Sequence, residues 1–379
     1  MNNTDKDIEK LDIDVDVNSR FKRGDYTSQK RADSSKKRDF NKIKGVCIIL
    51  LITTLVCLSL SIILIIRNIS KDKHEEQEIS IDEQMYTQAQ VDALVETASE
   101  NASAAAVEAL KGNIRDSVNN NMGMSEMLRR LFPENIVYTA RGGYVFATIS
   151  NQIPKNNISS ADLHLTDDNI RTYEVDGEVK SRTCIDVSEY NGEIDWQAVK
   201  NSGLVDFAMI RVGYRGYGSG KLVLDSRFEE NALGALKAGI PIGVYFFSQA
   251  TNAEEAMEEA EFVKEAIAPY NITYPVAIDI ERVDDSQGRG NLISKDERTV
   301  VVDEFCSQMT RAGYVPMIYG NTFSLFDMLD MEKLCQYNVW YAFYEDYIYY
   351  PYVLKMWQYS PSFSLPGIKE KVDINIYFI

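Results

Sequence analysis

Residues 275–281 read PVAIDIE, an apolar run that ends in two acidic side chains. A short apolar run of this kind is typical of a buried strand, and Asp279 and Glu281 come where that strand ends. Residues two apart lie on the same face of a strand, with their Cα atoms about 6.6 Å apart. Two carboxyl groups held so close cannot both ionise freely. We therefore expect one acid with a raised pKa and one base.

Similar apolar strands alternate with amphipathic helices on both sides of this run. The other strands of this alternating region are TCIDVS (183–188), FAMIRVGY (207–214), IPIGVYFFS (240–248) and VPMIYGN (315–321). We expect helices near 195–202, 226–238, 252–268, 294–312 and 323–334, with Asp195 as the N-cap of the first. Three further strands with only loops between them are VWYAFY (339–344), VLKMWQYS (353–360) and VDINIYFI (372–379).

Five βα units followed by three strands give eight strands, the number that closes a small barrel. The sequence therefore predicts an irregular β/α barrel over residues 182–379. A doubly wound open sheet is the alternative. No glycine-rich phosphate turn follows the first strand, which disfavours a nucleotide-binding version of that fold.

Four acidic residues fall at one rim of the predicted barrel. Catalytic groups in such barrels lie at the C-terminal ends of the parallel strands. Asp186 closes the first strand, Asp279 and Glu281 close the fourth, and Asp373 reaches the same rim if the last strand is antiparallel. Glycoside hydrolysis needs a pair of carboxyl groups, one to protonate the leaving oxygen and one as nucleophile or base. The alternatives for Asp279 and Glu281 are a solvated strand end and a two-carboxylate metal site.

Histidine and cysteine are too sparse for several other chemistries. His74 and His164 are the only histidines, and both precede the predicted barrel. A serine or cysteine nucleophile paired with histidine is therefore not expected there, and we predict no metal and no cofactor. The net charge of -17 also argues against a nucleic-acid partner.

Aromatic side chains supply the second part of a sugar site, because their faces stack on the C–H faces of pyranose rings. On or just after the strands lie Tyr214, Tyr245, Trp340, Tyr344, Trp357 and Tyr359, which together with Arg211 form the predicted substrate-binding set. The alternative for many of them is a place in the barrel core or wall.

The C-terminal half resembles the family 25 glycoside hydrolases, which are lysozyme-like N-acetylmuramidases. The motifs that carry the resemblance occur in the family's order: CIDVSEYNGEIDW, MIRVGYRGYG, GIPIGVYFFSQA, AIDIE, AGYVPMIYGN, VWYAFY, MWQYS and VDINIY. The resemblance implies hydrolysis of the β-1,4 bond between N-acetylmuramic acid and N-acetylglucosamine of peptidoglycan. It implies Glu281 as general acid/base and Asp279 as nucleophile or as support for a participating N-acetyl group. Asp186 and Asp373 are then the other two acids of the active site.

The N-terminal segment predicts a membrane anchor. Residues 45–66 hold 22 residues without a charge, enough to span a hydrocarbon core as one transmembrane helix. Ten Lys and Arg residues lie within 20–44, so we expect residues 1–44 to be a disordered cytoplasmic tail. The remainder, from residue 67 onward, is then extracytoplasmic at the cell membrane.

Two segments connect this anchor to the barrel. Residues 67–128 read as a linker and an Ala-rich helical stalk, with a capping box at Thr87 and Gln90 and a helix to about Leu110. Val91, Val95 and later alanines recur at 4-3 spacing, which suggests either self-association through the stalk or a lone solvated helix. Residues 129–181 read as a small β-rich module.

The sequence as a whole therefore favours a membrane-anchored muramidase that cleaves peptidoglycan. The alternative is a catalytically inactive barrel that binds the cell wall, since binding needs the aromatic residues but not the acids.

Overall fold

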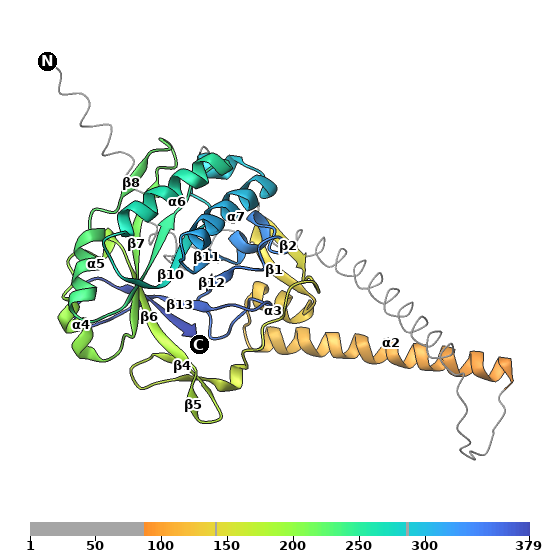
Figure 1. The fold of residues 1–379 in the computed structure, drawn as a ribbon. Helices are drawn as coiled ribbons and strands as arrows, with labels where there is room; N and C mark the ends of the chain where they lie inside the picture. The colour runs from red at the N-terminus through yellow and green to blue at the C-terminus, as the bar shows by residue number, and fades with distance from the viewer. Residues whose placement is uncertain (1–86, 141, 286–287) are drawn as a thin grey trace, which may run out of the picture. The chain divides into compact units, whose positions relative to one another are not determined.

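A computed structural model describes residues 87–140, 142–285 and 288–379 of the chain (Figure 1). The described part separates into two compact units, residues 87–131 and residues 132–379.

The first unit consists of two helices, α2 (Gln88–Asn119) and α3 (Met124–Leu131). Thr87 caps α2 in the predicted capping box with Gln90. The helix continues past Leu110, where the sequence predicted its end, and through Gly112, because one glycine costs a helix only about 1 kcal/mol. Val91 is 39% and Val95 41% exposed on this helix, and self-association through it stays a prediction.

The second unit is built around a closed eight-stranded barrel of mixed direction. The strands are β6 (Ser181–Val187), β7 (Phe207–Arg215), β9 (Ile242–Phe247), β10 (Ile272–Asp279), β11 (Pro316–Asn321), β12 (Asn338–Ala342), β13 (Met356–Phe363) and β14 (Val372–Phe378). A short strand, β8 (Leu222–Leu224), pairs antiparallel with β7 outside the ring. Pairing of β6 with β7 closes the barrel. The ladders that β14 makes with β13 and β6 are antiparallel, whereas the others in the ring are parallel.

The predicted fold class, an irregular β/α barrel of five βα units and three strands, is wrong. The region is a mixed eight-stranded β-barrel, and the helix expected at 323–334 is replaced by a five-residue π-helix (Ser324–Met328) and turns. Hydrogen bonds at Asp330 give a physical reason why the helix expected at 323–334 does not form. The Asp330 carboxylate accepts a hydrogen bond from the Glu332 N–H, and its own N–H donates to Thr299 Oγ1, so the backbone here is drawn out of the helical ladder.

In the described part of this unit, four α-helices pack on the outside of the strands (Figure 1). They are α4 (Trp196–Ser202), α5 (Phe228–Lys237), α6 (Ala253–Ile267) and α7 (Lys295–Arg311). Asp195 caps α4 as expected, through a 2.9 Å bond from the Ala198 N–H. The short 3-10 helices are Ser160–Asp162, Glu189–Asn191 and Arg289–Leu292.

Strand alternation separates two cores. Side chains such as Met209, Ala277, Met317 and Met356 form an inner cluster, whereas their strand neighbours join a larger cluster with the helices. Both faces of the strands are therefore buried, as in sheets covered by helices.

Residues 132–180 lie against the side of the barrel where the described chain places no α-helix. They form a hairpin, β1 (Asn135–Ala140) and β2 (Gly143–Thr148), and a three-stranded sheet, β3 (Leu163–Leu165), β4 (Arg171–Val175) and β5 (Glu178–Val179). Backbone bonds join this segment to the loop after β12, including Asn156 N–H to Pro351 O (2.9 Å) and Val353 N–H to Pro154 O (3.0 Å).

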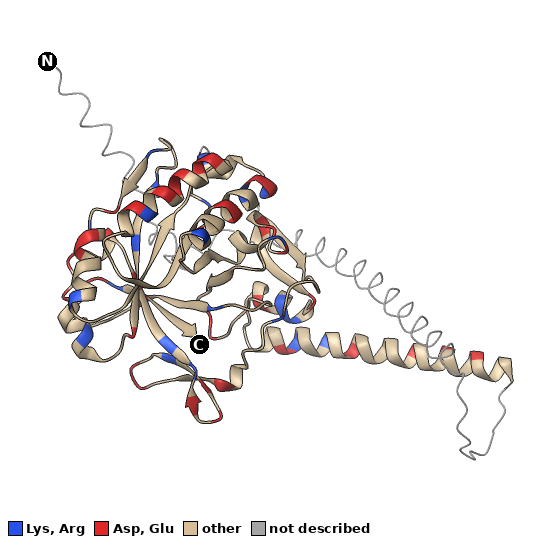
Figure 2. Ribbon diagram, in the orientation of Figure 1, with Lys and Arg blue, Asp and Glu red and all other residues tan. Residues whose placement is uncertain are grey.

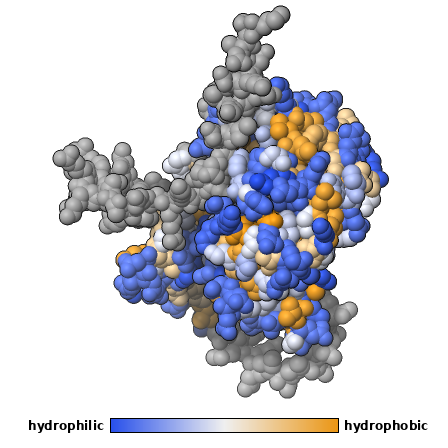
Figure 3. Space-filling model, turned by 90° about the vertical axis from the view of Figure 1, so that its left-hand side faces the viewer, coloured by the Kyte–Doolittle hydropathy of each residue, from blue (hydrophilic) through white to orange (hydrophobic). Residues whose placement is uncertain are grey.

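The predicted membrane segment, residues 45–66, lies outside the described residues, as does the tail before it. Over the ranges that are described, no helix is both long enough and apolar enough to cross a membrane. In the view of Figure 3, most of the visible described surface is hydrophilic and its hydrophobic residues form separate patches.

Candidate active site

The four predicted acids come together at one rim of the barrel. Asp186 is the penultimate residue of β6, Asp279 ends β10, and Glu281 follows two residues later. Asp373 lies on β14 directly opposite Asp186, because β14 runs antiparallel to β6. The solvent-exposed fractions of Asp186, Asp279 and Glu281 are 7%, 6% and 8%. Burial of several carboxyl groups in one place is costly and is a common mark of a functional site.

Asp186 is held by two side-chain amides through one of its oxygens. Gln358 Nε2 donates to Asp186 Oδ2 at 2.9 Å, and Asn375 Nδ2 donates to the same oxygen at 2.8 Å. Burial raises the pKa of Asp186 to about 6, and these two hydrogen bonds partly offset the rise. A proton on Asp186 would therefore sit on Oδ1, because Oδ2 already accepts two N–H groups.

Two tyrosine hydroxyls fix the orientation of the Gln358 amide. Tyr319 donates to Gln358 Oε1 at 2.9 Å, and Tyr344 donates to the same oxygen at 2.7 Å. The amide nitrogen must then point the other way, toward Asp186. Gln358 is 2% exposed, so this bonded chain lies inside the barrel.

The charges of the acids act on one another and on these tyrosines. Burial raises the pKa of Asp373 well above its ordinary value, and the charges of Asp186 and Glu281 raise it further. Burial also raises the pKa of the Tyr319 hydroxyl, with further contributions from Tyr344, Glu281, Asp279 and Asp186. Asp373 therefore keeps its proton to a higher pH than an ordinary carboxyl group does, while the two hydroxyls remain protonated donors.

Three aromatic rings, those of Trp340, Tyr319 and Tyr245, form a cluster in the barrel interior close to the acids. The Trp340 ring meets the Tyr319 ring edge-on at 4.6 Å and the Tyr245 ring at 5.9 Å between centroids. Trp340 Nε1 donates to Asn375 Oδ1 at 2.7 Å, which orients the Asn375 amide toward Asp186. Trp340 is only 1% exposed, so it presents almost no face to a ligand.

Arg211 and Tyr214 lie on β7, where Arg211 is paired in the sheet with Tyr245 of β9. Arg211 Nε donates to buried Asp225 at 2.7 Å, and its guanidinium lies 5.6 Å from the Tyr214 ring centre and 4.8 Å from that of Tyr190. The Arg211 charge acts on Tyr245, whose pKa is nevertheless raised by burial. Arg211 is thus fixed in position by an ion pair next to the predicted sugar contacts.

The structure does not bring Trp357 and Tyr359 to the acids. Both belong to the larger hydrophobic cluster outside the barrel strands, here called the outer core. Trp357 Nε1 donates to Phe343 O at 2.7 Å. The Arg171 guanidinium lies over both rings, 5.3 Å and 5.5 Å from their centres. Because Met356 and Gln358 face the barrel interior, alternation turns their neighbours outward.

Tyr319, Gln358 and Asn375 were missed in the sequence. Each lies an even number of residues from an interior position: Gln358 is two after Met356, Tyr319 is two after Met317, and Asn375 is two after Asp373. Alternation from Asp373, which the sequence places at the rim, could have found Asn375, whereas nothing in the sequence marks Met356 or Met317 as interior.

No group of three or more His, Cys, Asp or Glu side chains is arranged to hold a metal ion within residues 87–140, 142–285 and 288–379. The site therefore consists of four carboxyl groups, an amide–tyrosine chain and aromatic rings. That inventory is suited to acid–base chemistry on a glycosidic bond.

Comparison with known proteins agrees with this inventory. Residues 185–368 match the profile of Glycosyl hydrolases family 25. The C-terminal half of the chain is a family 25, lysozyme-like domain. This confirms the resemblance seen in the sequence.

Lysozyme M1 of Streptomyces globisporus is 34% identical to the chain over 100 residues, which cover 26% of this chain and 32% of that protein. The modular autolysin LytC of Streptococcus pneumoniae is 23% identical, with a TM-score of 0.49 over 64% of this chain and 58% of that chain. The bacterial lysozyme of Streptomyces coelicolor is 24% identical, with a TM-score of 0.42 over 52% and 91% of the two chains. The chain thus spans about a third of the length of the curated relative.

Proposed function

We propose that the family 25 domain is a muramidase that hydrolyses the β-1,4 bond between N-acetylmuramic acid and N-acetylglucosamine in peptidoglycan. The observation that carries the proposal is the convergence of Asp186, Asp279, Glu281 and Asp373 at one rim of a family 25 barrel. Support for the substrate comes from the family match and from the curated relative, which is named as a lysozyme.

The proposed roles follow the positions of the acids. Glu281 lies beyond the end of β10 and protonates the leaving glycosidic oxygen, then acts as base in the second half of the reaction. Asp279 is the nucleophile or supports a participating N-acetyl group. Asp373 and Asp186 hold the polar groups of the sugar. Asp186 accepts two side-chain N–H groups, and the tyrosines keep the Gln358 amide oriented toward it.

Hydrolysis fits the site better than wall binding alone. A binding barrel would need aromatic faces at the surface, whereas Trp340 is buried and the acids occupy the rim. Four carboxyl groups at that rim cost folding free energy and contribute nothing to stacking on sugars.

The test is digestion of purified peptidoglycan, followed by mass spectrometry of the new reducing ends. The proposal expects N-acetylmuramic acid at those ends. Ends that carry N-acetylglucosamine would identify a glucosaminidase, and absence of any new ends with bound protein would identify a wall-binding barrel.

We also propose that the domain acts outside the cytoplasm at the cell membrane, where its substrate lies. The uncharged stretch at 45–66 and the basic residues before it support this location. Protease added to intact, wall-stripped cells should remove the catalytic domain and spare the tail. A protected catalytic domain would contradict the orientation.

A further inference from the structure

Ser248 and Gln249, which follow β9, donate hydrogen bonds to the backbone of Asp279 and Glu281. The Ser248 N–H donates to the carbonyl oxygen of Asp279 at 3.0 Å. Gln249 Nε2 donates to the carbonyl oxygen of Glu281 at 3.4 Å. Ser248 is 2% and Gln249 1% exposed, so water does not compete for these bonds.

The loop after Glu281 fixes the orientation of the Gln249 amide. The Gly290 N–H donates to Gln249 Oε1 at 3.2 Å, which leaves Nε2 to face Glu281. A Cβ at position 290 would lie 2.5 Å from Gln249 Oε1, so only glycine allows this approach.

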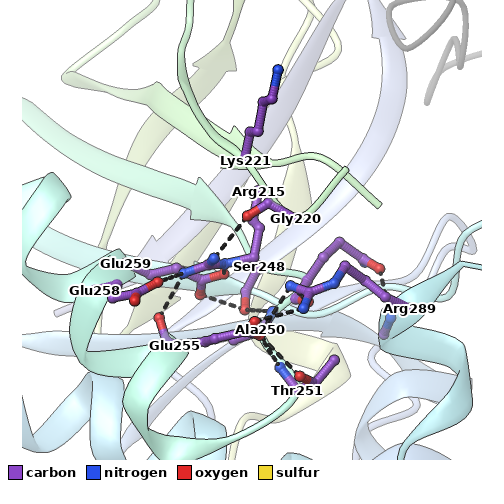
Figure 4. Close-up of polar contacts among 12 residues, drawn as sticks. Arg215, Gly220, Lys221, Ser248, Ala250, Thr251, Glu255, Glu258, Glu259 and Arg289 are labelled. Carbon is purple, nitrogen blue, oxygen red and sulfur yellow. Dashed lines mark hydrogen bonds and ion pairs between the residues drawn. The ribbon is translucent and has the colours of Figure 1, made fainter. Parts of the chain in front are cut away.

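Helix α6 anchors the side chain of Ser248. Ser248 Oγ donates to Glu259 Oε2 at 2.6 Å, and Arg215 Nε donates to Glu259 Oε1 at 2.9 Å (Figure 4). Arg215 also donates to the carbonyl oxygens of Gly220 (2.8 Å) and Glu255 (2.9 Å). Ser248 is therefore fixed to a buried ion pair rather than to a loop.

The same helix anchors Gln249 through Arg289. Arg289 donates to both carboxylate oxygens of Glu255, at 2.5 Å and 2.9 Å (Figure 4). It also donates to the main-chain oxygen of Gln249 at 3.3 Å. Partial burial raises the pKa of Glu255, but bonds from Arg289 and Thr251 lower it overall, so the pair is charged. Helix α6 carries six glutamates, which colour much of it red in Figure 2. Two of them, Glu255 and Glu259, bind Arg289 and Arg215 and so support the segment that follows β9.

We propose that Ser248 and Gln249 are positioning residues for Asp279 and Glu281, with Gln249 setting the place of the general acid. This rests on the proposed glycosidase function. A displacement of about 1 Å in a catalytic group can lower a rate about a hundredfold, so the orientation of Glu281 matters as much as its presence.

The experiment measures kcat and KM on peptidoglycan fragments for wild type, Gln249→Leu and Gly290→Ala. Both variants remove or displace the amide donor without touching a carboxyl group. We expect kcat to fall about ten- to a hundredfold with KM within about twofold, because the glycan contacts remain. Gln249→Glu keeps the shape, and its kcat should rise as the pH falls, because a protonated carboxyl donates to Glu281 O again.

Asn231→Ala is the matched control. Asn231 is a buried amide (1% exposed) on α5 that accepts from Trp196 Nε1, away from the acids. This variant should lower Tm while kcat and its pH profile stay as in wild type. If Gln249→Leu and Gly290→Ala behave like this control in an active enzyme, the positioning role is overturned. If the wild type releases no muramic acid ends, the proposed function itself fails and this inference falls with it.

Discussion

The two sides of the barrel are held by different interactions. On the side of β7, β9 and β10, α-helices cover the strands, and buried ion pairs such as Arg215–Glu259 fix the strand ends. On the side of β12 and β13 the described chain has no α-helix after the strands, and residues 132–180 take that place. There, tyrosine hydroxyls accept backbone N–H groups: Val137 donates to Tyr349 at 2.6 Å and Ser150 to Tyr352 at 2.8 Å. The segment ahead of the family 25 match thus stands in for the missing helices.

The largest expected effect comes from removing that segment. A chain that begins at Arg182 loses Ile153 and Ile170, which are buried in the outer core, and exposes Tyr352 and Tyr359. We expect its Tm to fall by about 10 °C or more relative to a chain that begins at Phe132. Thermal unfolding of both chains is the measurement. Equal Tm values would show that the barrel is autonomous from residue 182, as the sequence-based domain boundaries predict.

On the side of β7, β9 and β10, we expect substitution of Arg215 to lower the free energy of unfolding most. Its side chain is 4% exposed and that of Glu259 is 0% exposed, so Arg215→Met leaves a buried carboxyl without its cation. We expect a loss of about 3–5 kcal/mol in the free energy of unfolding, measured by urea denaturation. The control is Lys333→Met, which breaks an exposed pair with Asp296 and should leave the urea midpoint almost unchanged. Similar losses for the two variants would contradict the special role of the buried pair.

Asp186 should lower stability at neutral pH. Its folded-state pKa of about 6 lies above the value of an unfolded chain, so the folded protein binds the proton more tightly. The stability that the Asp186 proton contributes is fully present below about pH 4 and is lost as the pH rises through about 6. Asp186→Asn should raise the free energy of unfolding by about 3 kcal/mol at pH 7, with no gain near pH 3. A gain that does not depend on pH would mean that ionisation of Asp186 is not the cause.

The tyrosine side should lose less per substitution. Tyr349→Phe and Tyr352→Phe each leave a backbone N–H without its acceptor, and we expect a cost of about 1–2 kcal/mol each. Tyr144→Phe is the control, since Tyr144 is 40% exposed on β2. Chemical denaturation of the three variants gives their free energies of unfolding. A loss no larger than that of the control would show that the Tyr349 and Tyr352 hydroxyls do not stabilise this side of the barrel.

The sequence predicted much of this site, but only part of its surroundings. The sequence placed Asp279, Glu281 and Asp186 at strand ends, where the structure also has them, because acids that follow an apolar strand mark its end. Trp357 and Tyr359 were assigned to the site although they face outward. Strands buried on both faces show no polar alternation, so the sequence does not say which set points inward. The fifth helix was predicted from its apolar residues, whereas the turn at Asp330 depends on Thr299, which is distant in sequence.

Turnover of Glu281→Gln is the most direct test of the proposed glycosidase. The substitution keeps the shape of the side chain and removes the proton that the leaving oxygen requires. Muramidase rates against pH should fall at least about a hundredfold, while binding of glycan fragments changes little. A variant that keeps a near-wild-type rate would contradict the assignment of Glu281 as the general acid, and Asp186 would be the next residue to substitute.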